Sequence, residues 1–229
     1  PYASLNPRLS VGHAIAEPLR AHGRARTKEE MAKAAEDLLV RVGLQPKMAS
    51  QYPHNFSGGQ RQRIGIARAL SLRPKILICD EAVSALDVSV QSQILNLFNR
   101  LKKEFNLTYI FIAHDLSVVR YISDRILVMY LGTVMEIAPK AELFERRYHP
   151  YTESLISASP EPSTKPRKER IILTGEIPSP IHPPTGCKFH TRCFRRFDRC
   201  AAEEPELREI APGHFIRCHL YEPKGGVKA

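Results

Sequence analysis

The sequence predicts an α/β protein with a parallel β-sheet, a helical subdomain and a small cysteine-rich region near its C-terminal end. Three short apolar runs carry this prediction, at residues 75–81 (KILICDE), 107–115 (LTYIFIAHD) and 125–132 (RILVMYLG). Amphipathic helical patterns at 88–105 and 116–122 separate the runs. A strand–helix–strand–helix–strand order favours right-handed crossovers and a buried parallel sheet, whose strands read as nearly continuous apolar runs.

Helical patterns precede the first apolar run. Apolar residues recur at helical spacing over 11–19 and over 27–42. Thr27, followed three residues later by Glu30, is typical of a capping box, and Gly43 is typical of a helix stop. The loop QYPHNFSGG then leads into a helix that we expect over Gln60–Leu72.

Beyond residue 139 the pattern is helical in two pieces, broken at His149-Pro150. Residues 159–184 are rich in Pro, Ser, Lys and Glu, which predicts a linker, and within it we expect one short strand at Ile171–Leu173. Four of the five cysteines follow this linker.

Composition narrows the class of protein. The 229 residues are 43% hydrophobic and 25% charged, which is ordinary for a globular domain, and no run of 18 apolar residues predicts a membrane span. No signal-peptide pattern opens the chain. The net charge of +10 is scattered among acidic residues, and aromatics make up only 7%, so we expect no nucleic-acid partner. Because Pro1 comes first and the first methionine is Met31, we expect a fragment or a processed chain.

Polar groups follow two of the apolar runs. Asp80 and Glu81 end the first, where an aspartate suits Mg²⁺ and a glutamate could activate a water molecule. His114 ends the second and could hydrogen-bond a terminal phosphate. Neighbouring parallel strands would bring these ends close together. The plainer alternatives are two solvated carboxylates that begin a helix and a structural histidine.

Two loops carry further signals. The Ser57-Gly58-Gly59-Gln60 loop opens a helix, which is how a chain presents N–H groups to an anion, yet the phosphate loop G-x-x-x-x-G-K-[ST] does not occur in the sequence. The Ser84–Asp87 loop (SALD), taken alone, would consist of ordinary capping residues.

In this order the motifs resemble those of the ATP-binding-cassette (ABC) ATPases, a P-loop NTPase-type fold. FSGGQ resembles the signature motif, LICDE the Walker B strand, SALD the D-loop and His114 the switch histidine, over roughly residues 1–140. The segments RRYHPYTESLISASP and GEIPSPIHPPTGCKFHTRC resemble the C-terminal extension of oligopeptide and dipeptide importer ATPases, a group whose relatives also import nickel.

The resemblance implies roles for individual residues. Two such subunits would sandwich two ATP molecules head to tail. Asp80 would hold Mg²⁺ through water, Glu81 would be the general base and His114 would sense the γ-phosphate. The remaining implied nucleotide contacts are Ser57, Gly58, Gly59 and Gln60, facing the opposite subunit's ATP, and Asp87, linking the two sites.

The resemblance also implies an organisation and partners. We expect a helical signature subdomain at 1–72, the second half of a RecA-like core at 73–140 and an importer-type extension at 141–229. PYASLNPR resembles the segment just after the Q-loop, so the Walker A part would be missing, and this chain alone should not hydrolyse ATP. Residues Tyr2–Arg8 would lie near the coupling helix of a membrane subunit.

The implied partners are a second ATPase subunit, transmembrane permease subunits and, indirectly, a solute-binding protein, at the cytoplasmic face of the membrane. Two alternatives remain open: an ABC ATPase without a transport role, and a non-catalytic fragment that binds only a partner or a metal.

The cysteine cluster suits a metal. The spacing is Cys187-x5-Cys193-x6-Cys200-x17-Cys218, without a C-x2-C pair. Four thiolates among cationic residues suit an iron–sulfur cluster or a tetrahedral ion. The cysteine pattern resembles that of related peptide-importer ATPases, and this resemblance implies a [4Fe–4S] cluster. Zinc, with help from one of the histidines, and four metal-free thiols are the alternatives. Cys79, inside an apolar run, is expected to be core. The histidines considered for zinc are His190, His214 and His219.

Overall fold

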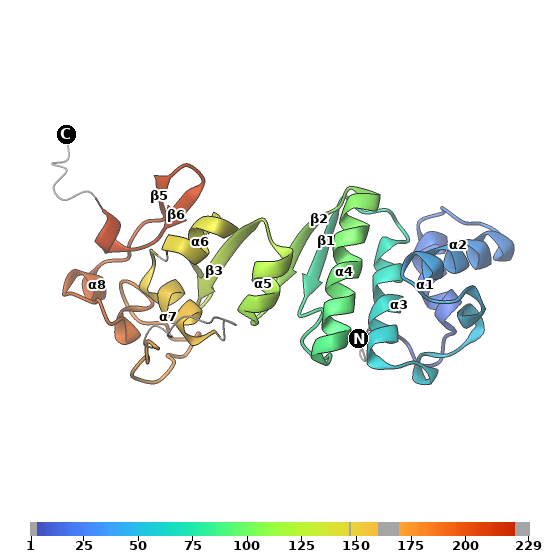
Figure 1. The fold of residues 1–229 in the computed structure, drawn as a ribbon, viewed down its shortest axis with the longest axis horizontal. Helices are drawn as coiled ribbons and strands as arrows, with labels where there is room; N and C mark the ends of the chain where they lie inside the picture. The colour runs from blue at the N-terminus through green and yellow to red at the C-terminus, as the bar shows by residue number, and fades with distance from the viewer. Residues whose placement is uncertain (1–3, 147, 160–169, 223–229) are drawn as a thin grey trace. The chain divides into compact units, whose positions relative to one another are not determined.

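The computed structural model describes residues 4–146, 148–159 and 170–222 of the protein. The chain forms two compact units, Pro1–Val118 and Val119–Ala229 (Figure 1). Residues 2 and 3 of the expected coupling segment and residues 160–169 of the expected linker lie outside the described residues. Within the described part of the chain, no helix combines the length and apolar character needed to cross a membrane.

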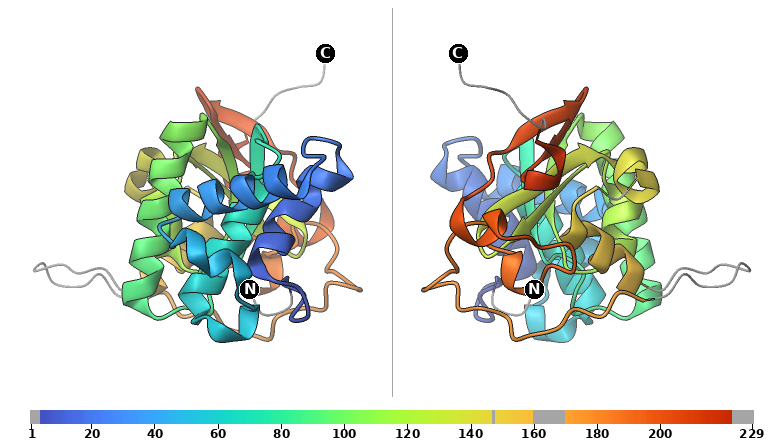
Figure 2. Two further views of the ribbon diagram at one scale, coloured as in Figure 1. Left: turned by 90° about the vertical axis from the view of Figure 1, so that its right-hand side faces the viewer. Right: turned by 90° about the vertical axis from the view of Figure 1, so that its left-hand side faces the viewer.

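Three helices of the first unit pack on one another: α1 (Val11–Ala21), α2 (Lys28–Arg41) and α3 (Gly58–Leu70). They appear in blue and cyan in Figures 1 and 2. Two 3-10 turns, Pro46–Ser50 and Pro53–Asn55, connect α2 to α3. All three predicted helices are confirmed, although α3 begins two residues earlier and ends two residues earlier than expected.

The expected start and stop of α2 are confirmed in detail. Thr27 and Glu30 form the capping box, in which each side chain bonds the other residue's backbone N–H. Gly43 has a φ of 76°, a conformation that glycine adopts without a steric cost. Ile15, Leu39 and Ile64 are fully buried, so each of the three helices contributes to this small core.

The rest of the first unit is a parallel strand pair with a helix on one face. β1 (Ile76–Asp80) pairs with β2 (Thr108–Ile112), in register from Ile76↔Thr108 to Asp80↔Ile112. The connecting helix α4 (Val88–Phe105) buries Phe98, whose ring meets the rings of Tyr109 and Phe111 edge-on at 5.4 and 5.7 Å. The parallel register places the carboxyl ends of both strands at one edge.

The second unit begins with a difference from the predicted sheet. The expected third parallel strand, β3 (Arg125–Tyr130), instead pairs antiparallel with β4 (Thr133–Pro139), in a four-stranded sheet of order β3-β4-β6-β5. The cause is local. Leu131 and Gly132 both have positive φ, 46° and 73°, which is the backbone of a tight two-residue hairpin turn. The described strands of the second unit thus form an antiparallel sheet, and the parallel pairing that the structure shows is that of β1 with β2.

Helices α5 (Leu116–Ile122), α6 (Lys140–Arg146) and α7 (Pro150–Ala158) confirm the predicted helical segments, including the break at His149-Pro150. The expected strand at Ile171–Leu173 is wrong, because the Ile171 N–H donates to the Ser157 hydroxyl at 3.2 Å and the segment pairs with no strand. The remaining elements of the second unit are a 3-10 turn at His190–Arg192, α8 (Arg199–Ala202), the hairpin β5 (Arg208–Ala211) and β6 (His214–Ile216), and a 3-10 turn at His219–Tyr221.

Candidate nucleotide and metal sites

The serine-glycine loop forms the start of α3. Ser57 is the N-cap residue: its hydroxyl accepts the Gln60 N–H at 3.4 Å, and the Gln60 side-chain carbonyl accepts the Ser57 N–H at 3.0 Å. Arg61 secures the preceding turn by donating to the Pro53 carbonyl at 2.9 Å. This reciprocal capping box satisfies two N–H groups of the helix start internally, and Ser57 itself remains exposed.

The glycines let this loop approach α4 closely. A Cβ built on Gly59 would lie 2.5 Å from Val90 Cγ1, closer than any side chain tolerates. A Cβ on Gly58 would lie 3.6 Å from Leu86 Cδ2, an ordinary contact distance. The structure therefore places the signature-like loop beside the Ser84–Asp87 loop and the start of α4, and Gly59 is the residue that permits this contact.

Glu81 and His114 meet at the carboxyl edge of β1 and β2. The Glu81 Oε1 atom lies 3.3 Å from His114 Nδ1, and both side chains are more than half exposed. Glu81 has a φ of 45°, a left-handed conformation that is uncommon for a residue with a side chain. It is held there by two bonds: its N–H donates to the Ile112 carbonyl at 3.0 Å, and its carbonyl accepts from the Ser84 hydroxyl at 3.0 Å. Asp80, exposed, immediately precedes it.

Asp87 caps helix α4. Its carboxylate accepts the Val90 N–H at 3.0 Å and the Ser89 hydroxyl at 2.9 Å. These hydrogen bonds, led by the one from Val90, lower the pKa of Asp87. The carboxylate is therefore charged at neutral pH and fully exposed to a partner.

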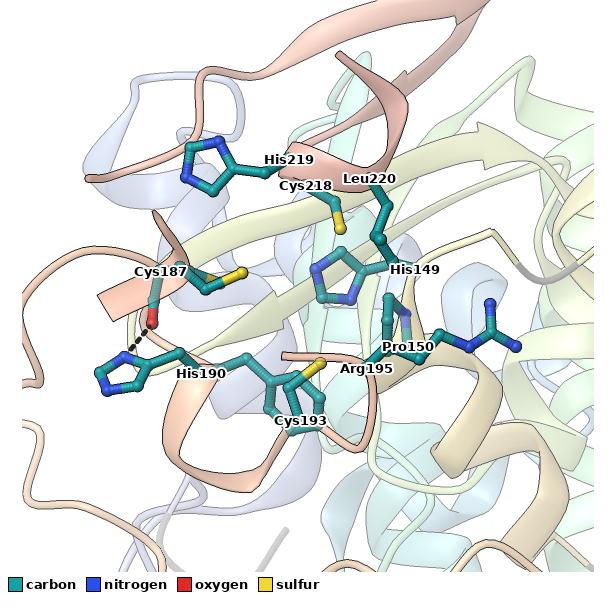
Figure 3. A pocket seen from close by; sticks show the side chains of 11 residues that line it. His149, Pro150, Cys187, His190, Cys193, Arg195, Cys218, His219 and Leu220 are labelled. Atoms are coloured by element: carbon teal, nitrogen blue, oxygen red, sulfur yellow. Dashed lines mark hydrogen bonds between the residues drawn. The ribbon is translucent and has the colours of Figure 1, made fainter. Parts of the chain in front are cut away.

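The four clustered cysteines line one small cavity in the second unit. Its volume is about 10 Å³, room for about one water molecule. The sulfurs of Cys187, Cys193 and Cys218 turn toward this common space (Figure 3), and Cys200 completes the set. The four cysteines expected to form one cluster therefore do line a common cavity.

Gly186 explains how two of them meet. The Cys187 N–H donates to the Cys200 carbonyl at 2.8 Å, so the loop lies directly on the backbone of α8. A Cβ on Gly186 would stand 2.5 Å from that same carbonyl, and its φ is 61°. Glycine is the residue that fits there.

Burial is the main influence on the pKa values of three cluster thiols. It raises the pKa of Cys187 to about 11 and of Cys218 to about 12, and it raises the pKa of Cys193, with repulsion between neighbouring thiolates as a smaller cause. All three are therefore neutral thiols at pH 7 in the absence of a cation. Burial also raises the pKa of Cys79 to about 12, in agreement with its expected place in the core.

Two of the three histidines considered for zinc have both ring nitrogens engaged, and the third, His190, has one nitrogen bonded and lines the cavity. His214 is fully buried between Glu136 and Glu142, at 2.8 and 3.1 Å. Both ring nitrogens of His219 are bonded, to the Glu222 carboxylate and to the Glu203 carbonyl. His190 Nδ1 lies 2.9 Å from the Cys187 carbonyl. In the described ranges, no three His, Cys, Asp or Glu side chains converge as they would around one metal ion.

A fourth histidine, which the sequence did not single out, also lines the cavity. His149 is 1% exposed, and its Nδ1 caps α7 by accepting the Tyr151 N–H at 3.0 Å. Burial lowers the pKa of His149 to about 4, opposed by the Arg217 backbone. Its Nε2 atom has no hydrogen-bond partner. The sequence signal was the proline at 150, which is typical of a first helical position and marks the residue before it as a cap.

A family described as "ABC transporter" matches residues 2–84, and one described as "Oligopeptide/dipeptide transporter, C-terminal region" matches residues 135–200. The dimeric post-hydrolysis structure of the ATP-binding cassette MJ0796, bound to ADP and Pi, aligns with a TM-score of 0.53 and 33% identity, over 59% of each chain. Fold and motifs thus define the class, an ATP-hydrolysing ABC cassette.

Curated relatives narrow the class. AppF of Bacillus subtilis (strain 168), an oligopeptide transport ATP-binding protein, is 55% identical over 223 residues, covering 96% of this chain and 68% of AppF. YkfD of the same strain is 54% identical with the same coverage. The chain belongs to the ABC transporter ATPases, in the group that carries the oligopeptide/dipeptide transporter C-terminal region.

Proposed function

We propose that this chain is part of the ATP-hydrolysing subunit of an ABC importer for dipeptides or oligopeptides. The family supports ATP and Mg²⁺ as the cofactors, and the names of AppF and its relatives support a peptide cargo. Its partners would be transmembrane permease subunits and a second ATPase subunit, as in the dimeric MJ0796 structure. It would act at the cytoplasmic face of the membrane, bound to the permease.

The Glu81–His114 pair carries the proposal. The backbone strain at Glu81 aims its carboxylate at the edge where the nucleotide of a cassette would lie, and such strain persists where the surroundings over-determine it. Glu81 would accept a proton from the attacking water, and His114, 3.3 Å away, would fix that carboxylate and contact the γ-phosphate. Asp80 would hold Mg²⁺ through water, since carboxylate and water oxygens suit that ion.

The remaining residues act across the dimer. Ser57, Gly58 and Gly59 would present the start of α3 to the γ-phosphate bound by the partner subunit, with Gln60 fixing the cap. Asp87, charged and exposed, would link this loop to the second site. The contact between Gly59 and Val90 supports that link, because it ties the two loops together within one chain.

Glu81→Gln tests this assignment in the assembled transporter, purified with its permease and reconstituted in vesicles. We expect ATP hydrolysis and peptide uptake to fall by about 10²–10⁴-fold while ATP binding is retained, because the amide cannot take a proton. Glu36→Gln, the same change at an exposed position of α2, should leave both unchanged. Full activity of the Glu81→Gln transporter would rule out the general-base role.

We propose further that the four clustered cysteines bind a [4Fe–4S] cluster. The donor set fits, since all four cysteines line one cavity, and four cysteine thiolates are the usual ligands of such a cluster. A single zinc ion with Zn–S bonds of about 2.3 Å needs its ligands already converging, and no such group is found in the described residues. A cluster separates the four sulfurs more widely, and the small cavity would have to expand to admit it. Anaerobic purification with iron, sulfide and zinc analysis tests the assignment, and protein free of iron would overturn it.

A further inference from the structure

The Nε2 atom of His149 is buried and has no hydrogen-bond partner of good geometry among the described residues, although the Arg217 backbone interacts with the ring. Its Nδ1 accepts the Tyr151 N–H, and a ring nitrogen that accepts a hydrogen bond carries no proton. The neutral ring therefore has its proton on Nε2. That atom is buried without a partner, although buried donors are nearly always satisfied.

The side chains that line the cavity around this donor include four cysteines. Three other polar side chains besides the cysteines line it. Both nitrogens of His219 are bonded, Arg195 pairs with Glu153 at 2.8 Å, and His190 uses its Nδ1 atom on the Cys187 carbonyl at 2.9 Å. In Figure 3 the His149 ring lies in the space toward which the labelled cysteine sulfurs turn. Thiols are poor acceptors, whereas thiolates, which form when a cation binds, are good ones.

We propose that His149 is a positioning residue of the metal site, donating its Nε2–H to a metal-bound cysteine sulfur. This inference rests on the proposed cluster. The tautomer excludes His149 as a ligand, because the Nε2 lone pair is not available. An N–H···S hydrogen bond withdraws electron density from the sulfur and stabilises the reduced cluster, so it raises the reduction potential.

Two substitutions separate the donor from the helix cap. In His149→Asn, the amide oxygen can replace Nδ1 as the cap acceptor, but the side chain is too short to reach the cavity. In His149→Gln, the amide nitrogen can reach the position of Nε2 while the cap is weakened. Each variant of the purified chain is reconstituted anaerobically with Fe²⁺ and sulfide, and its iron content, visible charge-transfer spectrum and reduction potential are measured. His182→Asn, at an exposed position outside the cavity, is the matched control.

We expect the Asn variant to bind iron with a shifted charge-transfer band and a more negative potential. The Gln variant should return toward the wild type, and the control should match it. Loss of iron from the Asn variant alone would also support the donor role. Wild-type values in the Asn variant, or equal losses in Asn and Gln, would overturn it, since then only the cap or the packing matters. A wild-type chain that takes up no iron overturns the metal site itself, and this inference with it.

Discussion

The glycines of helix α3 differ in how much space their neighbours leave for a side chain. A Cβ on Gly59 would stand 2.5 Å from Val90 Cγ1, and one on Gly58 would be at 3.6 Å from Leu86 Cδ2. A Cβ on Gly65 would meet nothing within 4 Å. The same residue type therefore serves a close helix contact at one position and only weakens the helix at another.

We expect Gly59→Ala to lower the free energy of unfolding by about 1–3 kcal/mol, because the new methyl group forces the starts of α3 and α4 apart. Gly65→Ala should raise it by about 0.5–1 kcal/mol, since alanine removes the entropic cost of glycine in a helix. Urea denaturation monitored by circular dichroism measures both. Adding Val90→Ala to Gly59→Ala should recover part of the loss, and strict additivity of the two changes would contradict the proposed contact.

Glu81 and His114 show what a pattern of residues reveals at this scale and what it leaves out. Their closeness follows from two parallel strands that each end in a polar residue, and the structure places them 3.3 Å apart. The left-handed backbone of Glu81 could not be read from the sequence, because it depends in part on a hydrogen bond to Ile112 of the neighbouring strand, besides the local bond from Ser84. Their catalytic roles stay predictions.

At the scale of elements, two helices begin with the same device. Thr27-x-x-Glu30 was recognised as a capping box, and the structure confirms it. Ser57-x-x-Gln60 has the same spacing, but it was interpreted only as an anion loop, although it forms a second capping box. Local signals of this kind are readable because all of their partners lie within four residues.

The Thr27–Glu30 box makes a pH-dependent contribution. Backbone N–H groups of Arg26 and Thr27 donate to the Glu30 carboxylate at 2.7 and 3.2 Å and lower its pKa. A lowered pKa in the folded state means that the stabilisation is present above the unfolded value and is lost as the pH falls through the folded one. The wild type should therefore exceed Glu30→Gln in stability at neutral pH, and the difference should vanish in acid.

Thermal melts of the two proteins at a series of pH values measure this difference. Glu29→Gln, one position earlier on α2, is the control, because the structure gives that carboxylate no capping bond. Thr27→Ala should cost about 0.5–2 kcal/mol at every pH. A gap between wild type and Glu30→Gln that persists unchanged in acid strong enough to protonate the carboxylates would contradict the carboxylate's role.

At the scale of the whole molecule, the sequence predicted the helices and the first parallel pair. It did not predict the β3–β4 hairpin, because the turn depends on a left-handed backbone at Leu131, a residue type that rarely adopts it. Pairings between distant segments were also missed. Strand β6 joins this sheet through Glu136↔Ile216, across some 80 residues of chain. The meeting of the four cysteines with His149 likewise needs contacts from several loops. The two boundaries expected between the three domains, after residues 72 and 140, stay predictions, whereas the structure divides into two compact units after residue 118.

A buried cluster of hydrogen-bonded side chains connects the segments of the second unit. Glu136 of β4 and His214 of β6 are both fully buried and lie 2.8 Å apart. The Nδ1 atom of His214 lies 3.1 Å from the Glu142 carboxylate of α6. The other Glu136 oxygen accepts the backbone N–H of His149 at 3.3 Å. One carboxylate and one imidazole thus connect β4, β6, α6 and the cap of α7.

We expect His214→Leu to destabilise the second unit by about 3–5 kcal/mol, because it leaves the Glu136 carboxylate buried without its partner. Hydrogen exchange followed by mass spectrometry measures this by segment: protection should fall in β4, β6 and α7, while α1–α3 of the first unit keep theirs. Adding Glu136→Gln should recover part of the lost stability, since it replaces the buried Glu136 carboxyl group that has lost its histidine partner. Arg208→Ala, which breaks an exposed pair with Glu206, should cost less than about 1 kcal/mol. If His214→Leu proved no more disruptive than Arg208→Ala, the cluster would not be what holds this unit together.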